Sequence, residues 1–252
     1  VSALVLAAVS SAAPAETPAP LKLCYEASAS GLPILALDFT ITETAAAYEI
    51  AAGSRASGML GWFSDYAMRG ESRGTIAAGK LRPSMHENSS RSRHRERRAH
   101  LDYAGDDTIL TALSPERPDH LPPTTQQIAG TVDPLTALLA ISRAVARVGH
   151  CGGVGIAVYD GRRRYDLALA DAGAERSPPS PDAPAGEVRR CSFALTKIAG
   201  FSSDRDDKPR TEHGRVWLPP PRAGVPLLPQ RVDFPSDWGA ITVRLAQPGS
   251  AK

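Results

Sequence analysis

The side chains with the clearest chemical potential are three cysteines, two of which are placed to form a disulfide. Cys151 and Cys191 each adjoin a strand-like segment and bracket a predicted hairpin. In an oxidising compartment such a pair forms a bridge, and closing a loop of about 40 residues contributes about 4 kcal/mol. Cys24 is then expected to be free and shielded in the first strand. A metal site that adds His150 and His213 to the pair lacks the short ligand spacings of metal sites, so no metal is expected.

A second motif with chemical potential is Gly70-Glu71-Ser72-Arg73-Gly74, which matches the GxSxG pattern of a hydrolase nucleophile elbow. That elbow requires an apolar strand before the serine and a helix after it. Here a polar segment precedes the motif and strand-like sequence follows, so we expect no catalytic residue. The glycine-rich segment 149–155 opens a strand rather than a helix and cannot hold a dinucleotide phosphate, so no cofactor is expected.

The third candidate is a basic run within 83–103, PSMHENSSRSRHRERRAHLDY. Its alternating cations are Arg91, Arg93, Arg95 and Arg97. On one long strand this spacing places four guanidinium groups on one face, with His86, His94 and His100 on the other. The favoured interpretation is an exposed edge strand protected by charge; the alternative is an anion-binding site. Nucleic acid is disfavoured because the run lacks interleaved aromatic residues and the chain is nearly balanced, with 29 basic and 27 acidic residues.

One helix is predicted over 134–148. Asp133 is a suitable N-cap, and Pro134 suits the first helical position. An apolar stripe of Leu135, Leu138 and Leu139 recurs at helical spacing. Glycines from position 149 onward end the helix.

The rest of the domain reads as short strands and turns. Asp160-Gly161 is a favoured hairpin dipeptide, and the 22 prolines and 21 glycines fit many turns. Pro-rich loops are expected over 114–125 and 172–186. We predict a mainly β fold, in which a curled antiparallel sheet, spiral or open barrel-like, packs around the helix near 134–148.

The segment 59–68 is predicted to be a strand that carries two large aromatic residues. Successive strand residues face opposite sides, so one of Trp62 and Phe63 is expected to enter the core while the other faces out or lines the concavity. The functional hypothesis is that this segment and the leucine stripe border the same apolar space.

The N-terminal region resembles the end of a secretory signal. Residues 3–9 are apolar and are followed by small residues suited to cleavage; the alternative is a buried N-terminal strand. No other stretch approaches the length of a membrane span. The predicted organisation is a signal remnant over 1–20, a single β-rich domain over 21–247 and a tail over 248–252, in a protein exported to the periplasm.

Several motifs together resemble one bacterial family, domain of unknown function number 3108, whose members are exported envelope proteins. They are GMLGWFSDY, SRSRHRERRAHLDY, GTVDPLTALL, VYDGRRRYDL and RCSFALTKIAGF. The resemblance spans about residues 23–247. It implies an all-β, spiral-like sheet with a central helix, and it transfers no catalytic residue.

Two function classes follow from these observations. The first is a non-catalytic periplasmic protein that holds a lipid, another amphiphile or a partner segment in the concavity of its sheet. The second is a hydrolase acting on envelope polymers. An apolar concavity would favour the first class, and a buried polar cluster within one pocket would favour the second.

Overall fold

The computed structural model describes residues 18–93, 95–105, 107–114, 121–177, 186–201, 211–221, 226–236 and 239–246. Its strands are β1 (Leu21–Ala29), β2 (Leu32–Glu43), β3 (Ala47–Ala56), β4 (Ala67–Ala77), β5 (Lys80–Ser92), β6 (Arg95–Ala104), β7 (Asp107–Ser114), β8 (Val154–Tyr159), β9 (Arg164–Ser177), β10 (Gly186–Ala199), β11 (Thr211–Leu218), β12 (Arg231–Ser236) and β13 (Gly239–Ala246). Its helices are α1 (Gly58–Phe63), α2 (Thr125–Ile128) and α3 (Pro134–Val148).

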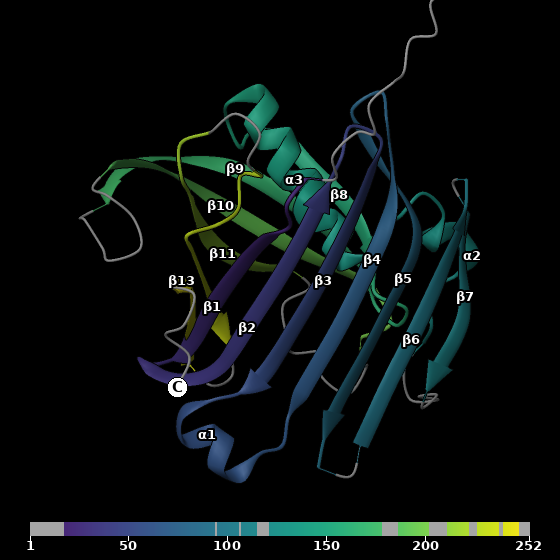
Figure 1. The fold of residues 1–252 in the computed structure, drawn as a ribbon, viewed down its shortest axis with the longest axis horizontal. Helices are drawn as coiled ribbons and strands as arrows, with labels where there is room; N and C mark the ends of the chain where they lie inside the picture. The colour runs from purple at the N-terminus through teal and green to yellow at the C-terminus, as the bar shows by residue number, and fades with distance from the viewer. Residues whose placement is uncertain are drawn as a thin grey trace, which may run out of the picture.

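The strands within the described residues form one antiparallel sheet of 13 strands, built from two meanders. The first meander runs from β1 to β7 and the second from β8 to β13, each pairing with its sequence neighbours. They are joined where β1 pairs with β13, with Ala27 opposite Val243. β7 and β8 form the two ends of the sheet, which is not closed. The sheet curls, and the second meander crosses behind the first (Figure 1).

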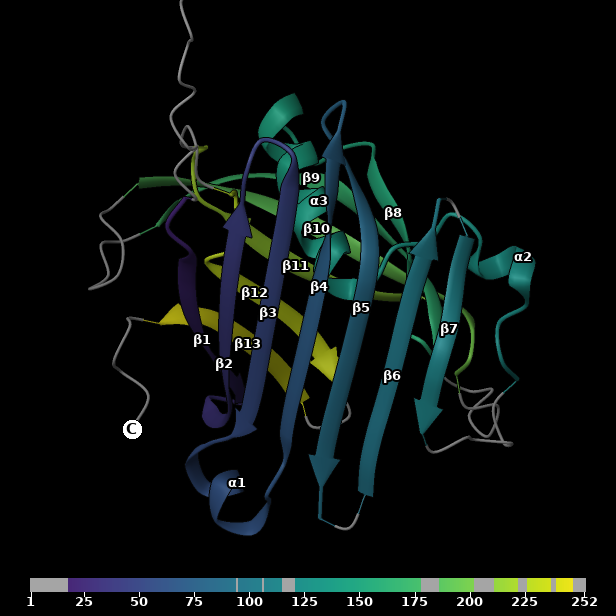
Figure 2. The ribbon, with the colours of Figure 1, turned by 45° about the vertical axis from the view of Figure 1, so that its right-hand side comes forward.

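Helix α3 lies inside the curl, where the chain passes from one end of the sheet to the other (Figures 1 and 2). The Asp133 side chain accepts hydrogen bonds from the backbone N–H groups of Leu135 and Thr136, which satisfies donors in the first helical turn. The helix ends at Gly149 in the left-handed conformation, at φ 75°. The prediction of an antiparallel β sheet around one helix near 134–148 is therefore confirmed.

The core forms where α3 meets the two meanders. One apolar cluster joins Val145 and Cys151 to strands of the second meander, including Val216 and Leu218. A second cluster joins Leu139 to Tyr48 and Ile50 of the first meander, among others. The helix therefore contributes to both halves of the core.

The segment predicted as a strand at 59–68 is instead divided between α1, a loop and the start of β4. Helix α1 covers Gly58–Phe63, and Trp62 and Phe63 are 82% and 74% exposed. Neither enters the core, so that prediction is wrong. The physical reason is Gly58, whose φ of +56° turns the chain out of β3 before the strand can continue.

The basic run forms a hairpin rather than one long strand. β5 ends at Ser92, Arg93 adopts a turn conformation with φ 51°, and β6 starts at Arg95. β5 pairs with β4 and β6, while β6 pairs with β5 and β7. The prediction of an edge strand is therefore wrong, because both strands lie inside the sheet.

Other predictions differ in extent or lie outside the described residues. The loop predicted over 172–186 is partly strand, because β9 continues to Ser177. The signal segment over residues 3–9, the tail over 248–252 and His94 lie outside the described residues.

Candidate functional site

Two adjoining apolar cavities lie between α3 and the curled sheet, with volumes of about 210 and 110 Å³. The larger is lined by α3 and the second meander, including Leu138, Ile141, Leu169, Phe193 and Val216. The smaller is lined largely by the first meander, including Leu23, Leu37, Phe39 and Ile41. Together they reach the lower end of the roughly 300–1,000 Å³ typical of small-ligand pockets.

Leu138 is the helix residue that borders both cavities, together with Pro229 and Val232 from the opposite side. The other two residues of the predicted stripe lie elsewhere. Leu139 is fully buried in the core, and Leu135 packs toward Gly70 of β4. Of the stripe, only Leu138 therefore borders this apolar space. Trp62 and Phe63, which were expected beside it, do not line it.

A disulfide between Cys151 and Cys191 joins the end of α3 to β10, with 6.0 Å between the two Cα atoms. The backbone N–H of Cys151 also donates to Asp171 of β9 at 2.9 Å, which helps to hold the pKa of the Asp171 carboxyl below its usual range. The predicted pairing is present, and Cys24 is free. Cys24 is partly exposed rather than shielded, because it alternates with the buried Tyr25. A disulfide fits an oxidising compartment.

A buried polar cluster lies at the start of α3, where Ser72 of β4 and His86 of β5 meet Asp133. All three residues are at most 2% exposed. The Ser72 hydroxyl donates to Asp133 Oδ1 at 2.6 Å and lies 2.8 Å from His86 Nδ1. The Thr136 hydroxyl donates to Asp133 Oδ2 at 2.6 Å. The cluster therefore ties the first turn of α3 to two strands.

The hydrogen positions in this cluster follow from its donors. Ser72 has one hydroxyl hydrogen, which it gives to Asp133, so His86 Nδ1 must donate to Ser72. His86 Nε2 lies 3.1 Å from Asn88 Nδ2, which can only donate. His86 is therefore neutral with its proton on Nδ1. Burial lowers the pKa of His86, against the opposing charge of Asp133.

This arrangement differs from that of a hydrolytic serine. A general base must accept the proton of the nucleophile, but His86 Nδ1 already carries a hydrogen where it faces Ser72. Ser72 also lies in the middle of β4, not at a strand-to-helix turn, and is fully buried. The chemistry available to the cluster is hydrogen bonding that holds α3 in place.

The sequence reveals only part of this cluster. The sequence indicates that Asp133 is a helix N-cap, because it precedes a proline and an apolar stripe. The inward direction of His86 depends on a register shift between β4 and β5 beside Arg73, which no local pattern indicates, whereas Ser72 follows the regular alternation of β4. Tyr48 is buried, and its hydroxyl oxygen lies 2.9 Å from that of Thr136. In the sequence it is indistinguishable from an ordinary core residue.

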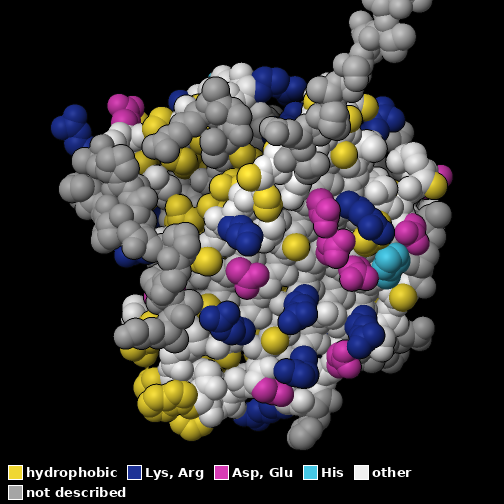
Figure 3. All heavy atoms as spheres, viewed as in Figure 1, with side chains coloured by type: hydrophobic (Ala, Val, Ile, Leu, Met, Phe, Trp, Pro, Cys, Tyr) yellow, Lys and Arg dark blue, Asp and Glu magenta, His cyan; other side chains and the backbone are white. Residues whose placement is uncertain are grey.

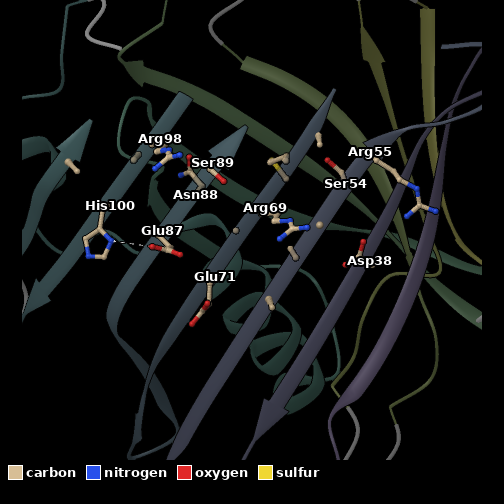
Figure 4. A pocket seen from close by; sticks show the side chains of 18 residues that line it. Asp38, Ser54, Arg55, Arg69, Glu71, Glu87, Asn88, Ser89, Arg98 and His100 are labelled. Atoms are coloured by element: carbon tan, nitrogen blue, oxygen red, sulfur yellow. Dashed lines mark ion pairs between the residues drawn. The ribbon is translucent and has the colours of Figure 1, made fainter. Parts of the chain in front are cut away.

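A wide, shallow depression of about 980 Å³ lies on the outer face of β2 to β6 and reaches β7 (Figure 4). Three arginines and three carboxylates line it, with small residues between them: Arg55, Arg69, Arg98, Asp38, Glu71 and Glu87. His100 forms an ion pair with Glu87 at 3.7 Å. Opposite charges alternate and are open to water, so the depression selects no single sign of ligand charge.

The four arginines predicted to share one face do not do so. Arg91 is paired with Glu96 in register and faces outward, whereas Arg97 pairs with Ser90 on the inner face. The hairpin turn at Arg93 reverses the chain and so breaks the alternation. Among the residues that the structure describes, no group of three His, Cys, Asp or Glu side chains could hold a metal ion.

Comparisons with known proteins agree with this fold. A solved structure with a similar fold is the beta-barrel-like protein of domain of unknown function DUF1849 from Brucella abortus, at a TM-score of 0.55 and 11% identity. The match covers 90% of this chain and 96% of that one. No curated protein matches the sequence. The model of a family described as a protein of unknown function, DUF3108, matches residues 24–246. The chain therefore belongs to the DUF3108 family.

Proposed function

We propose that this protein is an exported, non-catalytic binding protein that holds the apolar part of a lipid or another amphiphile between α3 and the curled sheet. The observation that carries the proposal is the pair of adjoining apolar cavities around Leu138. Apolar walls interrupted by few polar atoms bind hydrocarbon through the hydrophobic effect, which is proportional to the area removed from water.

The architecture supports such a role. The cavities lie between two meanders that come from different halves of the chain, and the disulfide holds the end of α3 on β10. Both features keep the helix in place while the space beside it is filled. The disulfide also supports export to an oxidising space such as the periplasm. None of the described helices is both long and apolar enough to cross a membrane.

Hydrolysis of envelope polymers is the weaker alternative. The buried polar cluster that would have favoured it has its histidine proton facing the serine, and it lines neither apolar cavity. We therefore propose binding rather than hydrolysis.

Substitution of Leu138 by tryptophan tests the proposal. The larger side chain should fill the space beside α3 and displace the ligand, while overpacking costs about 1–3 kcal/mol of folding free energy. Native mass spectrometry of protein expressed in the periplasm should show a bound lipid-sized species in the wild type that is absent from Leu138→Trp.

The matched control is Leu121→Trp, at a leucine that is 81% exposed, which should keep the bound species. A wild-type protein that carries no such species and binds no fluorescent fatty acid, together with a destabilised Leu138→Trp variant, would show that the space is only imperfectly packed core.

A further inference from the structure

Helix α1 turns most of its large apolar side chains toward water. A side chain at Gly58 would lie 2.6 Å from the Pro33 carbonyl oxygen, and one at Gly61 would lie 3.3 Å from that of Ala56. Both glycines therefore lie close to the backbone of neighbouring residues although they are exposed, and Leu60 is the least exposed residue of the helix. Trp62 and Phe63 are 82% and 74% exposed, and no residue of α1 is buried.

This orientation is the reverse of an ordinary surface helix, which buries its apolar stripe. Met59 on the same helix is 60% exposed, and Leu32, next to the Pro33 on which α1 packs, is 58% exposed. Figure 3 shows the hydrophobic group at the lower edge of the molecule, where Figure 1 places α1. We call Leu32, Met59, Trp62 and Phe63 the apolar tip. An exposed patch of this kind marks an interaction surface.

A group of arginines lies beside the apolar tip, at the β5–β6 turn. The backbone N–H of Arg93 donates to Asp65, in the loop that follows α1, at 2.5 Å. Arg91 pairs in register with Ala67 at the start of β4. Both figures of the ribbon place α1 and this turn at the same end of the sheet (Figures 1 and 2).

Among the residues that the structure describes at this end, cations outnumber anions. Arg91, Arg93 and Arg95 are exposed, and their side chains make no hydrogen bond or ion pair with another described residue. The carboxylates nearby are engaged, because Asp65 accepts from the Arg93 backbone and Glu96 from the Arg98 side chain. We call Arg91, Arg93 and Arg95 the basic turn.

We propose that the apolar tip and the basic turn together dock this end of the sheet on the surface of an anionic lipid bilayer, a role that goes beyond the proposed cavity and does not depend on it. Aromatic side chains insert at the boundary between headgroups and acyl chains, while arginines beside them attract anionic headgroups. The tip projects from the sheet, which suits a flat, deformable partner.

Vesicle co-sedimentation tests the apolar half of this surface. The full chain should bind vesicles that contain phosphatidylglycerol more tightly than vesicles of phosphatidylcholine alone. Trp62→Ser with Phe63→Ser should weaken that binding at least tenfold, because most of the inserted apolar area is lost. Leu121→Ser removes an equally exposed leucine elsewhere and should leave binding unchanged.

The basic half is tested by charge removal. Arg91→Ser with Arg95→Ser should weaken binding roughly 20-fold, since each cation near an anionic surface contributes. The control pair Arg73→Ser with Arg82→Ser removes two exposed arginines from the opposite end of the sheet and should have little effect. Binding should also fall in 1 M salt, where screening acts over about 3 Å.

Tryptophan fluorescence locates the contact without relying on variants that could unfold. In a Trp238→Phe background, brominated lipid should quench the emission of the bound protein, and adding Trp62→Phe should preserve vesicle binding but abolish this quenching, because the remaining Trp217 is buried. The proposal would be overturned if the wild-type protein did not bind anionic vesicles or if the control variants lost binding equally. It would also be overturned if quenching survived Trp62→Phe in the Trp238→Phe background. None of these measurements depends on a lipid bound in the cavity. A negative result here is therefore distinguishable from a negative result for Leu138→Trp.

Discussion

Asp133 is the residue whose side chain holds the most structure together. Its carboxyl accepts hydrogen bonds from two backbone N–H groups of α3 and from the hydroxyls of Ser72 and Thr136. A buried carboxyl is tolerated only where its oxygens are satisfied, and here the partners come from the helix itself and from β4. The Asp133 side chain thus determines both where α3 begins and where its first turn contacts the sheet.

The neutral state of His86 makes stability depend on pH at the residue scale. Burial lowers the pKa of His86 in the folded protein, below the roughly 6.5 of an unfolded chain. The unfolded state therefore binds the proton first, and the free energy of unfolding should decrease as pH falls below about 6.5, by up to about 1.4 kcal/mol per pH unit. Nearby Asp133, Asp160 and Glu87 oppose the shift, so the dependence ends once His86 protonates in the folded state.

Urea denaturation from pH 7.5 to 5.5 measures this dependence. His86→Gln should lower stability at pH 7.5 by about 1–3 kcal/mol, because buried partners lose a hydrogen bond, and should remove part of the acid-side slope. His213→Gln changes an exposed histidine and should leave the slope as it was. An identical slope in His86→Gln would show that other groups cause the dependence.

At the scale of elements, α3 is held at both ends by different chemistry. Hydrogen bonds to Asp133 and β4 fix its start, and the disulfide to β10 fixes its end. The helix crosses the interior between the two meanders, so these attachments also hold the meanders around the cavities. The short helix α1 has no comparable interior role and instead presents its apolar side outward.

Removing the disulfide should weaken the attachment of α3 to β10. Cys151→Ser with Cys191→Ser should lower the free energy of unfolding by about 2–5 kcal/mol, measured by urea denaturation without reductant. Cys24→Ser should have little effect, because that thiol makes no bridge. Peptide mapping without reduction should recover the 151 and 191 peptides linked; a linked Cys24 peptide would contradict the assignment.

At the scale of the whole molecule, the two meanders share one sheet and one core. β1 pairs with β13 along six residue pairs, and the Tyr25 hydroxyl of β1 donates to the Pro229 carbonyl beside β12 at 2.8 Å. These contacts join residues more than 200 positions apart in the chain. Such a sheet should unfold as one cooperative unit.

Substitution of Ile50, which is fully buried in the first meander, tests this cooperativity. Ile50→Ala should cost about 2–5 kcal/mol. With Trp62 and Trp238 changed to phenylalanine, it should shift the fluorescence transition of Trp217, in the second meander, by the same amount as the transition seen by circular dichroism. The exposed neighbour Glu49, changed to alanine, should stay within about 0.5 kcal/mol. Two separate transitions would indicate independently stable halves.

The sequence by itself determined the features that depend on neighbouring residues. Asp133-Pro134 and the leucine stripe specify the start and face of α3, and Asp160-Gly161 specifies a turn, because caps and turns are satisfied within a few residues. The alternating patterns indicated a β-rich fold, and two cysteines beside strands indicated the disulfide. These signals were enough for the fold class and the central helix.

Only the tertiary structure decided which way the remaining side chains point. Whether Arg91 to Arg97 form one strand or a hairpin depends on the left-handed turn at Arg93, and the burial of His86 beside buried Met85 depends on a register shift between β4 and β5. A one-residue change in register moves every side chain to the other face. Trp62 and Phe63 face water because the left-handed Gly58 turns the chain out of β3 and against the backbone of Pro33 in β2, a contact that no local periodicity encodes.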